Sequence, residues 1–212
     1  MNIKIYVEGG GHGPHSKALQ TACRRGFHEF FKKAGMQGMM PRISACGTRR
    51  LAYEDFCNAL DLAKADDFIV LLVDSEDPVA TEDDPWEHLI HRQSDQWDKP
   101  PTAAAENAHL MVQCMESWFI ADKETLRSFY GQGFRESALP SRPNIEEIPK
   151  DTLYDGLKNA TKDTITKGQY SKGKHSFDIL ALINPDLVRQ ASQHADRLLR
   201  VLMDKAVTQT SN

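Results

Sequence analysis

The sequence predicts an α/β fold: a mostly parallel four-stranded sheet flanked by helices, with a C-terminal helical extension. Three observations support this prediction. The chain has 212 residues and is 40% hydrophobic, which is enough to fill the core of a domain. Apolar runs and amphipathic segments alternate in the order β-α-β-α-β, which is typical of parallel sheets. Residues 68–73 are apolar without alternation, as expected for a strand buried on both faces.

The first half of the chain supplies three of the predicted strands. Residues 3–7 form the first strand, and a glycine-rich turn follows it. Ser16 begins a helix that runs to about residue 34, with its apolar side chains on one face. The remaining elements of this half are a strand at 42–46, a helix at 51–63 and the strand at 68–73.

The second half is predicted to be more irregular. Residues 77–107 are polar and rich in proline, and we interpret them as an irregular insertion. Next we expect a fourth strand, a helix from about Glu116 and a segment capped by Asp122. Two more helices are expected at 151–163 and 176–205, and the second is interrupted near residue 184. The predicted organisation is an α/β domain over residues 1–130, with residues 131–207 packed on it as the extension.

Composition and charge exclude several classes of protein. The formal net charge is only -4, so binding of nucleic acid through bulk positive charge is not expected. The four cysteines form no CxxC pair, which argues against a zinc knuckle and is typical of reduced intracellular thiols. No apolar stretch approaches the roughly 20 residues that span a bilayer. We therefore expect a cytoplasmic protein with no membrane partner.

Three acidic residues follow the ends of predicted strands. Glu8 ends the first strand, and Asp74 and Glu76 follow the third. Because the carboxyl ends of parallel strands share one edge of a sheet, these side chains can converge. Clustered carboxylates raise each other's pKa unless a cation neutralises them, and oxygen ligands suit Mg²⁺ or Mn²⁺. For Glu8 alone, a solvated strand end is the more frequent explanation; the three acids together favour a metal site.

Several stretches resemble known proteins. "YVEGGG" and "LLVDSED" are similar to the acidic motifs of the Toprim domain of topoisomerases, primases and OLD-type nucleases. The whole chain resembles small Toprim-like bacterial proteins related to the RloB type, through "ACGTRRLAYEDF", "HLMVQCMESWFIAD", "FYGQGF" and "YSKGKHSF". One departure is that Asp74-x-Glu76 replaces the usual Asp-x-Asp pattern, which changes the reach of the second carboxylate.

The resemblance implies a metal-dependent nuclease that hydrolyses nucleic-acid phosphodiesters, in phage defence. It implies Glu8 as a catalytic metal ligand with Asp74 and Glu76, and Glu116 as a further ligand. A first-turn acid that favours the helix dipole explains Glu116 equally well. OLD-type nucleases are similar in using a lysine outside the acidic motifs, so Lys174 and His175 are candidates for stabilising charge at the phosphate. A solvated basic loop is the alternative for these two residues.

Substrate contacts are predicted from the glycine-rich turn and from nearby basic residues. Gly9 and Gly10 let the backbone turn close to substrate, although the turn has no P-loop signature. Arg49 and Arg50 begin the helix after the second strand and can face phosphate, although ordinary surface arginines fit them equally well. Lys172, in the basic and glycine-containing link at 167–175, is the last predicted substrate contact; a solvated basic loop is the alternative for it too.

The resemblance also implies partners. They are nucleic acid, either DNA or RNA, and a separately encoded ABC-type ATPase, because the chain has no Walker motif of its own. A homodimer is left open. The alternative function is a non-catalytic Toprim-like interaction module that binds an ATPase or nucleic acid without cleaving it.

Overall fold

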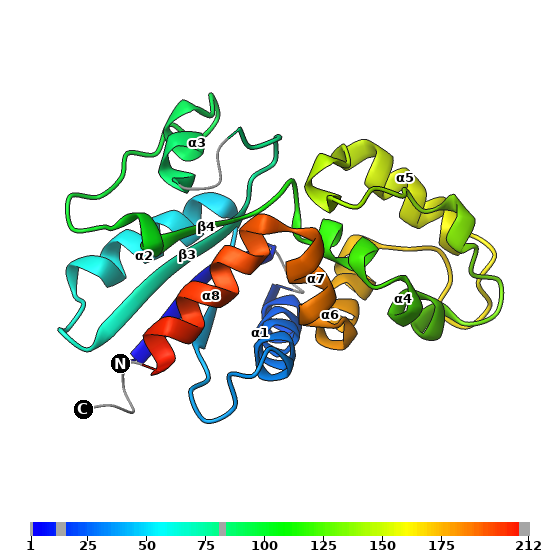
Figure 1. Cartoon of the computed structure of the whole chain (residues 1–212), viewed down its shortest axis with the longest axis horizontal. Helices are drawn as coiled ribbons and strands as arrows, with labels where there is room; N and C mark the ends of the chain where they lie inside the picture. Colours follow the sequence, from blue (N-terminus) through cyan, green and yellow to red (C-terminus); the bar gives the residue numbers. More distant parts are fainter. Residues whose placement is uncertain (1, 12–15, 81–83, 208–212) are drawn as a thin grey trace.

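The sheet of the protein has four parallel strands, which confirms the predicted α/β fold class (Figure 1). The computed structural model describes residues 2–11, 16–80 and 84–207. Within them the strand order is β2-β1-β3-β4. The strands are β1 (Asn2–Gly10), β2 (Arg42–Gly47), β3 (Asp67–Asp74) and β4 (Ala108–Met111). The two central strands, β1 and β3, carry the predicted metal ligands Glu8 and Asp74 near their carboxyl ends, although β1 runs two residues past Glu8 to Gly10.

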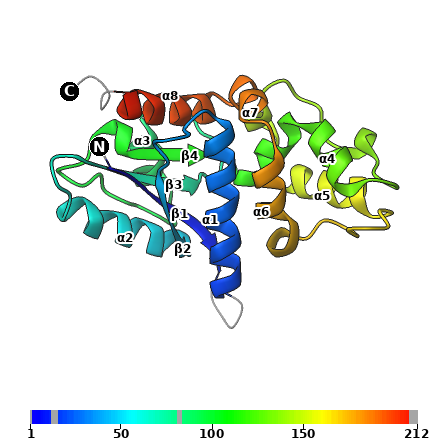
Figure 2. The ribbon, with the colours of Figure 1, turned by 90° about the horizontal axis from the view of Figure 1, so that it is seen from below.

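Helices cover both faces of the sheet (Figure 2). On one face lie α1 (Ser16–Lys33) and α8 (Gln193–Val207). On the other lie α2 (Arg49–Asp61) and α3 (Pro85–His91). Alternate residues of β3 enter two different cores: Val70 and Leu72 on the α1 side, and Leu71 and Val73 on the α2 side. This double burial explains why the third strand is a continuous apolar run.

The segment predicted to be an irregular insertion contains a helix, α3. Asp84 caps it by accepting a hydrogen bond from the Trp86 amide at 3.0 Å, and Pro85 occupies its first turn, where a missing amide hydrogen costs nothing. Trp86 and Trp97 are buried in the core between α2, α3 and the sheet. The prolines in this segment suggested loops, and the helix is only seven residues long, too short to show a clear periodic pattern.

The C-terminal extension begins as a group of helices beside the sheet domain and ends in α8, which lies over the sheet (Figure 1). Its helices are α5 (Lys150–Thr161), α6 (Lys172–Leu182) and α7 (Pro185–Ala191), followed by α8. Before them come α4 (Lys123–Tyr130) and the 3-10 turns η1 (Ala105–Asn107), η2 (Met115–Ala121), η3 (Glu136–Ala138) and η4 (Ile145–Glu147). None of the helices in the described ranges has the length and apolar character that crossing a bilayer requires.

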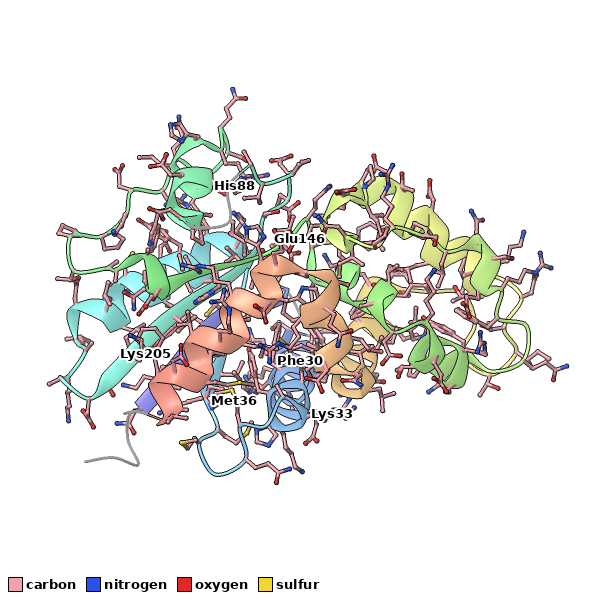
Figure 3. The ribbon with its side chains drawn as sticks, viewed as in Figure 1. Phe30, Lys33, Met36, His88, Glu146 and Lys205 are labelled. Carbon is pink, nitrogen blue, oxygen red and sulfur yellow. The ribbon has the colours of Figure 1, made fainter. Side chains whose placement is uncertain are left out.

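One contact ties the extension to the rest of the protein, and another joins two segments of the extension itself. Helix α6 packs against α1 at Gly26, where a Cβ would lie 2.8 Å from the carbonyl oxygen of Phe177. Glu146 lies beside the start of α8 (Figure 3), where it accepts hydrogen bonds from the amide of His194 at 2.9 Å and the hydroxyl of Ser192 at 2.5 Å. The extension therefore shares the core that covers the α1 face of the sheet.

Candidate metal centre

Three carboxylates meet at the carboxyl edge of the sheet, as the strand ends predict. Glu8, Asp74 and Glu76 each place one oxygen so that the three oxygens lie within 4.8 Å of one another. Strands β1 and β3 pair in parallel up to Val7 and Leu72, so Glu8 lies one residue and Asp74 two residues beyond the last pair, at the same edge of the sheet. This acidic cluster, Glu8–Asp74–Glu76, can hold a metal ion, because hard divalent cations bind several oxygen ligands at short range.

The backbone after β3 fixes the second and third acids. The amides of Ser75 and Glu76 donate to the carbonyls of Met111 at 2.9 Å and Gln113 at 2.8 Å, so pairing with the fourth strand continues past Asp74. Glu76 has a φ of 67°, in the left-handed region that non-glycine residues rarely adopt. Such strained residues often lie in functional sites, where surrounding contacts hold them.

Burial makes the cluster electrostatically unfavourable without a cation. Desolvation, reinforced by the negative charges of Glu116 and Glu8, raises the pKa of Asp74 to about 8. Desolvation also raises the pKa of Glu8, an effect that Arg49 opposes and Glu76 adds to. The Oδ1 atom of Asp74 accepts a hydrogen bond from the Met115 amide at 2.8 Å, which holds the carboxylate in place.

Three basic side chains surround the cluster. Lys150 forms an ion pair with Glu76. Lys172 Nζ lies 3.9 Å from Asp74 Oδ2. Arg49 Nη1 lies 3.9 Å from Glu8 Oε2, but the same guanidinium is held at 2.5 Å by Asp95 and also donates to the Asp74 carbonyl. Because Arg49 is shared with a fourth acid, the positive charges do not balance the cluster.

Glu116 is adjacent to the cluster but has its own partners. Its side chain is completely buried, and it accepts hydrogen bonds from the hydroxyls of Tyr154 at 3.0 Å, Tyr170 at 3.1 Å and Ser176 at 3.1 Å. Lys172 Nζ is 3.8 Å from its Oε2 atom. Glu116 is therefore outside the three-oxygen group and acts on it through charge, by raising the pKa of Asp74.

The structure brings Lys172, rather than Lys174 and His175, to the acids. Lys174 is exposed, and its Nζ lies 3.5 Å from the carbonyl of Lys167. His175 is buried beside Tyr130, whose hydroxyl is 3.1 Å from its Nδ1, and burial lowers the pKa of this imidazole. Both residues lie in or beside the first turn of a helix that starts earlier than predicted, so only Lys172 faces the cluster.

The two predicted arginines lie in different environments. Arg49 reaches the cluster, whereas Arg50 is exposed and pairs with Glu54 at 2.7 Å on the surface of α2. Gly9 and Gly10 line the site, as expected for the glycine-rich turn. A Cβ on Gly10 would lie 2.4 Å from Gln20 Cγ, so the close approach of the turn to α1 requires glycine there.

A pocket of about 290 Å³ opens beside the carboxylates. Glu8, Asp74, Glu116 and Lys172 contribute its charged part. Ser176 adds a hydroxyl, and apolar side chains and glycine backbone form the remainder: Gly9, Gly10, Gly11, Leu19, Gly47, Met111, Met115, Gly173 and Phe177. The carboxylates are thus reachable from a concave, mostly apolar site, the usual form of a small-ligand site.

Sequence reasoning missed Lys150 and the tyrosines that bind Glu116. Lys150 begins α5 and lies 74 positions from its partner Glu76. Tyr154 and Tyr170 come from the same extension. Nothing in the local sequence distinguishes Lys150 from other surface lysines, because the contact depends on how the extension folds back. A search for tyrosines in segments predicted to pack on the acidic edge could have suggested the other two.

The site fits a divalent cation on the chemistry of its donors. All three ligand atoms are carboxylate oxygens, which suit Mg²⁺, Mn²⁺ or Ca²⁺ better than softer metals. The buried Oε2 atom of Glu8 has no hydrogen-bond partner among the described residues. Buried polar atoms are nearly always paired, so this oxygen marks the place where a cation would bind.

One family model matches most of the chain. Residues 7–203 match a domain of unknown function, DUF4276. The chain belongs to this family. The match includes the three acids of the cluster as well as Lys150 and Lys172 from the extension, so the site lies wholly within the family's domain. No curated protein and no solved structure matches the chain.

Proposed function

We propose that the chain is a Toprim-like nuclease that uses Mg²⁺ or Mn²⁺ to hydrolyse nucleic-acid phosphodiesters. The observation that carries this proposal is the meeting of the three carboxylate oxygens within 4.8 Å at the edge of the sheet, with lysines beside them. When bound, a divalent ion would activate water and neutralise charge that develops on the phosphate.

The residues of the site take separate parts in this proposal. Glu8, Asp74 and Glu76 hold the ion. Lys172 receives the phosphate: burial works against its charged form, but the charges of Glu116 and Asp74 outweigh burial and raise its pKa, so the side chain stays protonated. A fixed positive charge beside the scissile phosphate stabilises the transition state more than the ground state.

The electrostatic balance supports an anionic substrate that binds together with the ion. Without a cation the pocket is dominated by carboxylates, which repel phosphate. A divalent ion at the cluster would remove this repulsion and release Lys150 from part of its attraction to Glu76. Phosphate binding is therefore expected to depend on the metal.

The test combines metal binding with cleavage. Wild-type protein should show a Mn²⁺-dependent rise in melting temperature and should cut plasmid DNA or structured RNA, and EDTA should abolish both effects. A ligand at 100 times its Kd stabilises a protein by about 2.7 kcal/mol, which a melting experiment resolves easily. Glu8→Gln and Asp74→Asn should lose the shift and the cleavage, whereas Glu54→Gln on the surface of α2 should keep both.

Two results would separate the alternatives. A wild-type protein with no Mn²⁺ shift and no cleavage, alone or with a partner ATPase, would refute the nuclease proposal. A clear Mn²⁺ shift without any cleavage would favour the interaction module. The proposed role in phage defence depends on the resemblance alone, and it predicts that Glu8→Gln removes protection in a plaque assay.

A further inference from the structure

We infer that the apolar part of the pocket accepts one unpaired nucleobase next to the phosphate at the carboxylates. The substrate class would then be a single-stranded segment or loop of nucleic acid. This inference rests on the proposed nuclease function and adds the form of the substrate to it. It begins from a feature that phosphate and metal binding leave unexplained, namely the apolar wall beside the acids.

The apolar wall comes from four elements that meet around the cluster. Leu19 and Phe177 are half-buried side chains on α1 and α6, and Met111 and Met115 come from the end of β4 and from η2. A metal ion and a phosphate need only the charged groups. An apolar surface directly beside them is stabilised only when an apolar part of the same ligand covers it, because contact with water gives no hydrophobic gain.

Helix α6 presents both kinds of contact on one side. Lys172 and Ser176 are four residues apart, as are Gly173 and Phe177, and all four line the pocket. Residues at this spacing share a helix face, and both pairs border the same pocket. Because Lys172 and Phe177 line one pocket, a ligand that touches the ammonium group of Lys172 lies within reach of the Phe177 ring. In a nucleotide, phosphate and base have this proximity, and bases stack well on aromatic rings and on methionine.

The size of the pocket favours a single base over a base pair. Its volume of about 290 Å³ is at the lower end of the range for ligand sites. Backbone closes one side, since Gly10 approaches Gln20 and a Cβ on Gly47 would lie 3.1 Å from the carbonyl oxygen of Gly11. A base within a duplex would have to leave its stack, which costs a few kcal/mol. Unpaired bases avoid this cost.

The experiment compares substrates that differ only in pairing. The substrates are a single-stranded DNA, an RNA of the same sequence, the fully paired duplex and a hairpin that exposes the sequence in its loop. Wild-type protein with Mn²⁺ should cut the unpaired substrates at least tenfold faster than the duplex. The DNA and RNA arms show which sugar the site takes. Equal cutting of the duplex and the single strands would overturn the inference.

A variant that fills the pocket tests the site itself. Leu19→Trp should keep the Mn²⁺ melting shift but lower the binding of a fluorescent single-stranded oligonucleotide in Ca²⁺ at least tenfold, measured by anisotropy. Leu62→Trp is the matched control, because Leu62 is 81% exposed and lies at the end of α2. If Leu19→Trp does not fold, Phe177→Leu replaces it, since it removes the ring and keeps an apolar side chain.

The readouts distinguish the two proposals. Loss of the Mn²⁺ shift in the wild type would refute the metal site, and the inference with it. A normal shift combined with unchanged oligonucleotide binding in both pocket variants would overturn the base site and leave the metal centre standing. Binding that is lost in the pocket variants, with the metal shift intact, is the result that supports the inference.

Discussion

Asp74 is the residue of the site whose pKa the surrounding structure raises to about 8. It is 5% exposed, and burial together with the charges of Glu116 and Glu8 raises its pKa to about 8. An acid whose pKa rises on folding favours the folded state at low pH and disfavours it as the pH increases. The metal-free protein therefore loses stability between about pH 4 and pH 8 through this residue.

Replacing this carboxylate should stabilise the metal-free protein. Asp74→Asn keeps an oxygen for the Met115 amide and removes the buried charge. In EDTA at pH 8 we expect a gain of roughly 1–4 kcal/mol in the free energy of unfolding, which shrinks as the pH approaches 4. Urea denaturation at three pH values measures it. Asp77→Asn is the control, since Asp77 is an exposed partner of Arg92; a loss of stability in Asp74→Asn at every pH would contradict the prediction.

At this scale the sequence predicts ligands better than their partners. Glu8, Asp74 and Glu76 could be predicted to meet because each lies near the carboxyl end of a strand in a parallel sheet. Lys150 could not, because its place depends on a distant segment folding back. His175 looked like a catalytic residue in a basic loop, but the loop is the first turn of α6 and the imidazole packs against Tyr130.

At the scale of elements, the close contact of β1 with α1 sets the shape of the site. Gly10 has a φ of 94°, and an added Cβ would lie 2.4 Å from Gln20 Cγ and 2.9 Å from the Gln20 backbone. Gly11 also has a positive φ, of 56°, but a Cβ there meets no atom of the described residues within 4 Å. Substitutions at Gly10 and Gly11 therefore distinguish the cost of steric crowding, present only at Gly10, from the cost of backbone strain, present at both.

These glycines give a paired prediction. Gly10→Ala should lower the free energy of unfolding by about 2–4 kcal/mol, because it combines strain with a clash against backbone. Gly11→Ala should lower it by about 1 kcal/mol, from the left-handed conformation alone. Chemical denaturation of both variants checks the difference. Equal losses of stability in the two variants would mean that α1 shifts to accommodate the Cβ of Gly10→Ala without a free-energy cost.

Glu146 links η4 to the start of α8. Desolvation opposes its charge, but hydrogen bonds from His194 and Ser192 outweigh that effect and lower its pKa. A carboxylate at a helix N-terminus is also favoured by the helix dipole. Because the pKa is lowered on folding, the charged form stabilises the protein above the ordinary pKa of glutamate, and this contribution disappears as the pH falls through the folded-state pKa.

Removing this charge should therefore be costly at neutral pH. Glu146→Gln is expected to lower stability by about 1–3 kcal/mol at pH 7, and by much less below pH 4. Glu147→Gln is the matched control, since Glu147 forms an exposed ion pair with Arg142 and should change stability by less than about 1 kcal/mol. Thermal or urea unfolding at both pH values measures the effect; equal losses in the two variants would contradict the capping role.

Elements with a strong local signal could be predicted, and those that depend on tertiary contacts could not. The strands β1, β2 and β3 were expected from apolar runs that glycine or acids end. Helix α3 is short and begins at a proline within a polar segment, so its signal is weak. Helix α6 begins at Lys172 because its first turn packs near Leu19 of α1, a contact that the sequence does not show.

At the scale of the whole molecule, the sheet domain and the extension share one core. Side chains of Leu153, Leu157, Leu198 and Leu202 belong to the same buried cluster as Ile5. The sequence predicted an extension over residues 131–207 packed on the first domain, and in the structure α8 returns from the extension to cover the sheet. The sequence could not show which helix covers the sheet, because amphipathic helices look alike whichever surface they cover.

Truncation should test how far the first part depends on the second. Residues 1–130 alone would expose the apolar face of the sheet that α8 covers, together with the surface under α6. We expect this fragment to aggregate or to lack cooperative unfolding in calorimetry, and to show no Mn²⁺ shift. A fragment that melts cooperatively and binds Mn²⁺ would show that the sheet domain is independent.

The hydrogen bonds of Glu116 have a consequence for protein engineering. This carboxylate lies on η2, whereas its three hydroxyl donors come from α5, from the loop after it and from α6. A chimaera that joins the sheet domain to a foreign set of helices would leave the Glu116 carboxylate buried without these hydrogen-bond donors. The two parts of the chain must therefore be transplanted, shuffled or redesigned as a single unit.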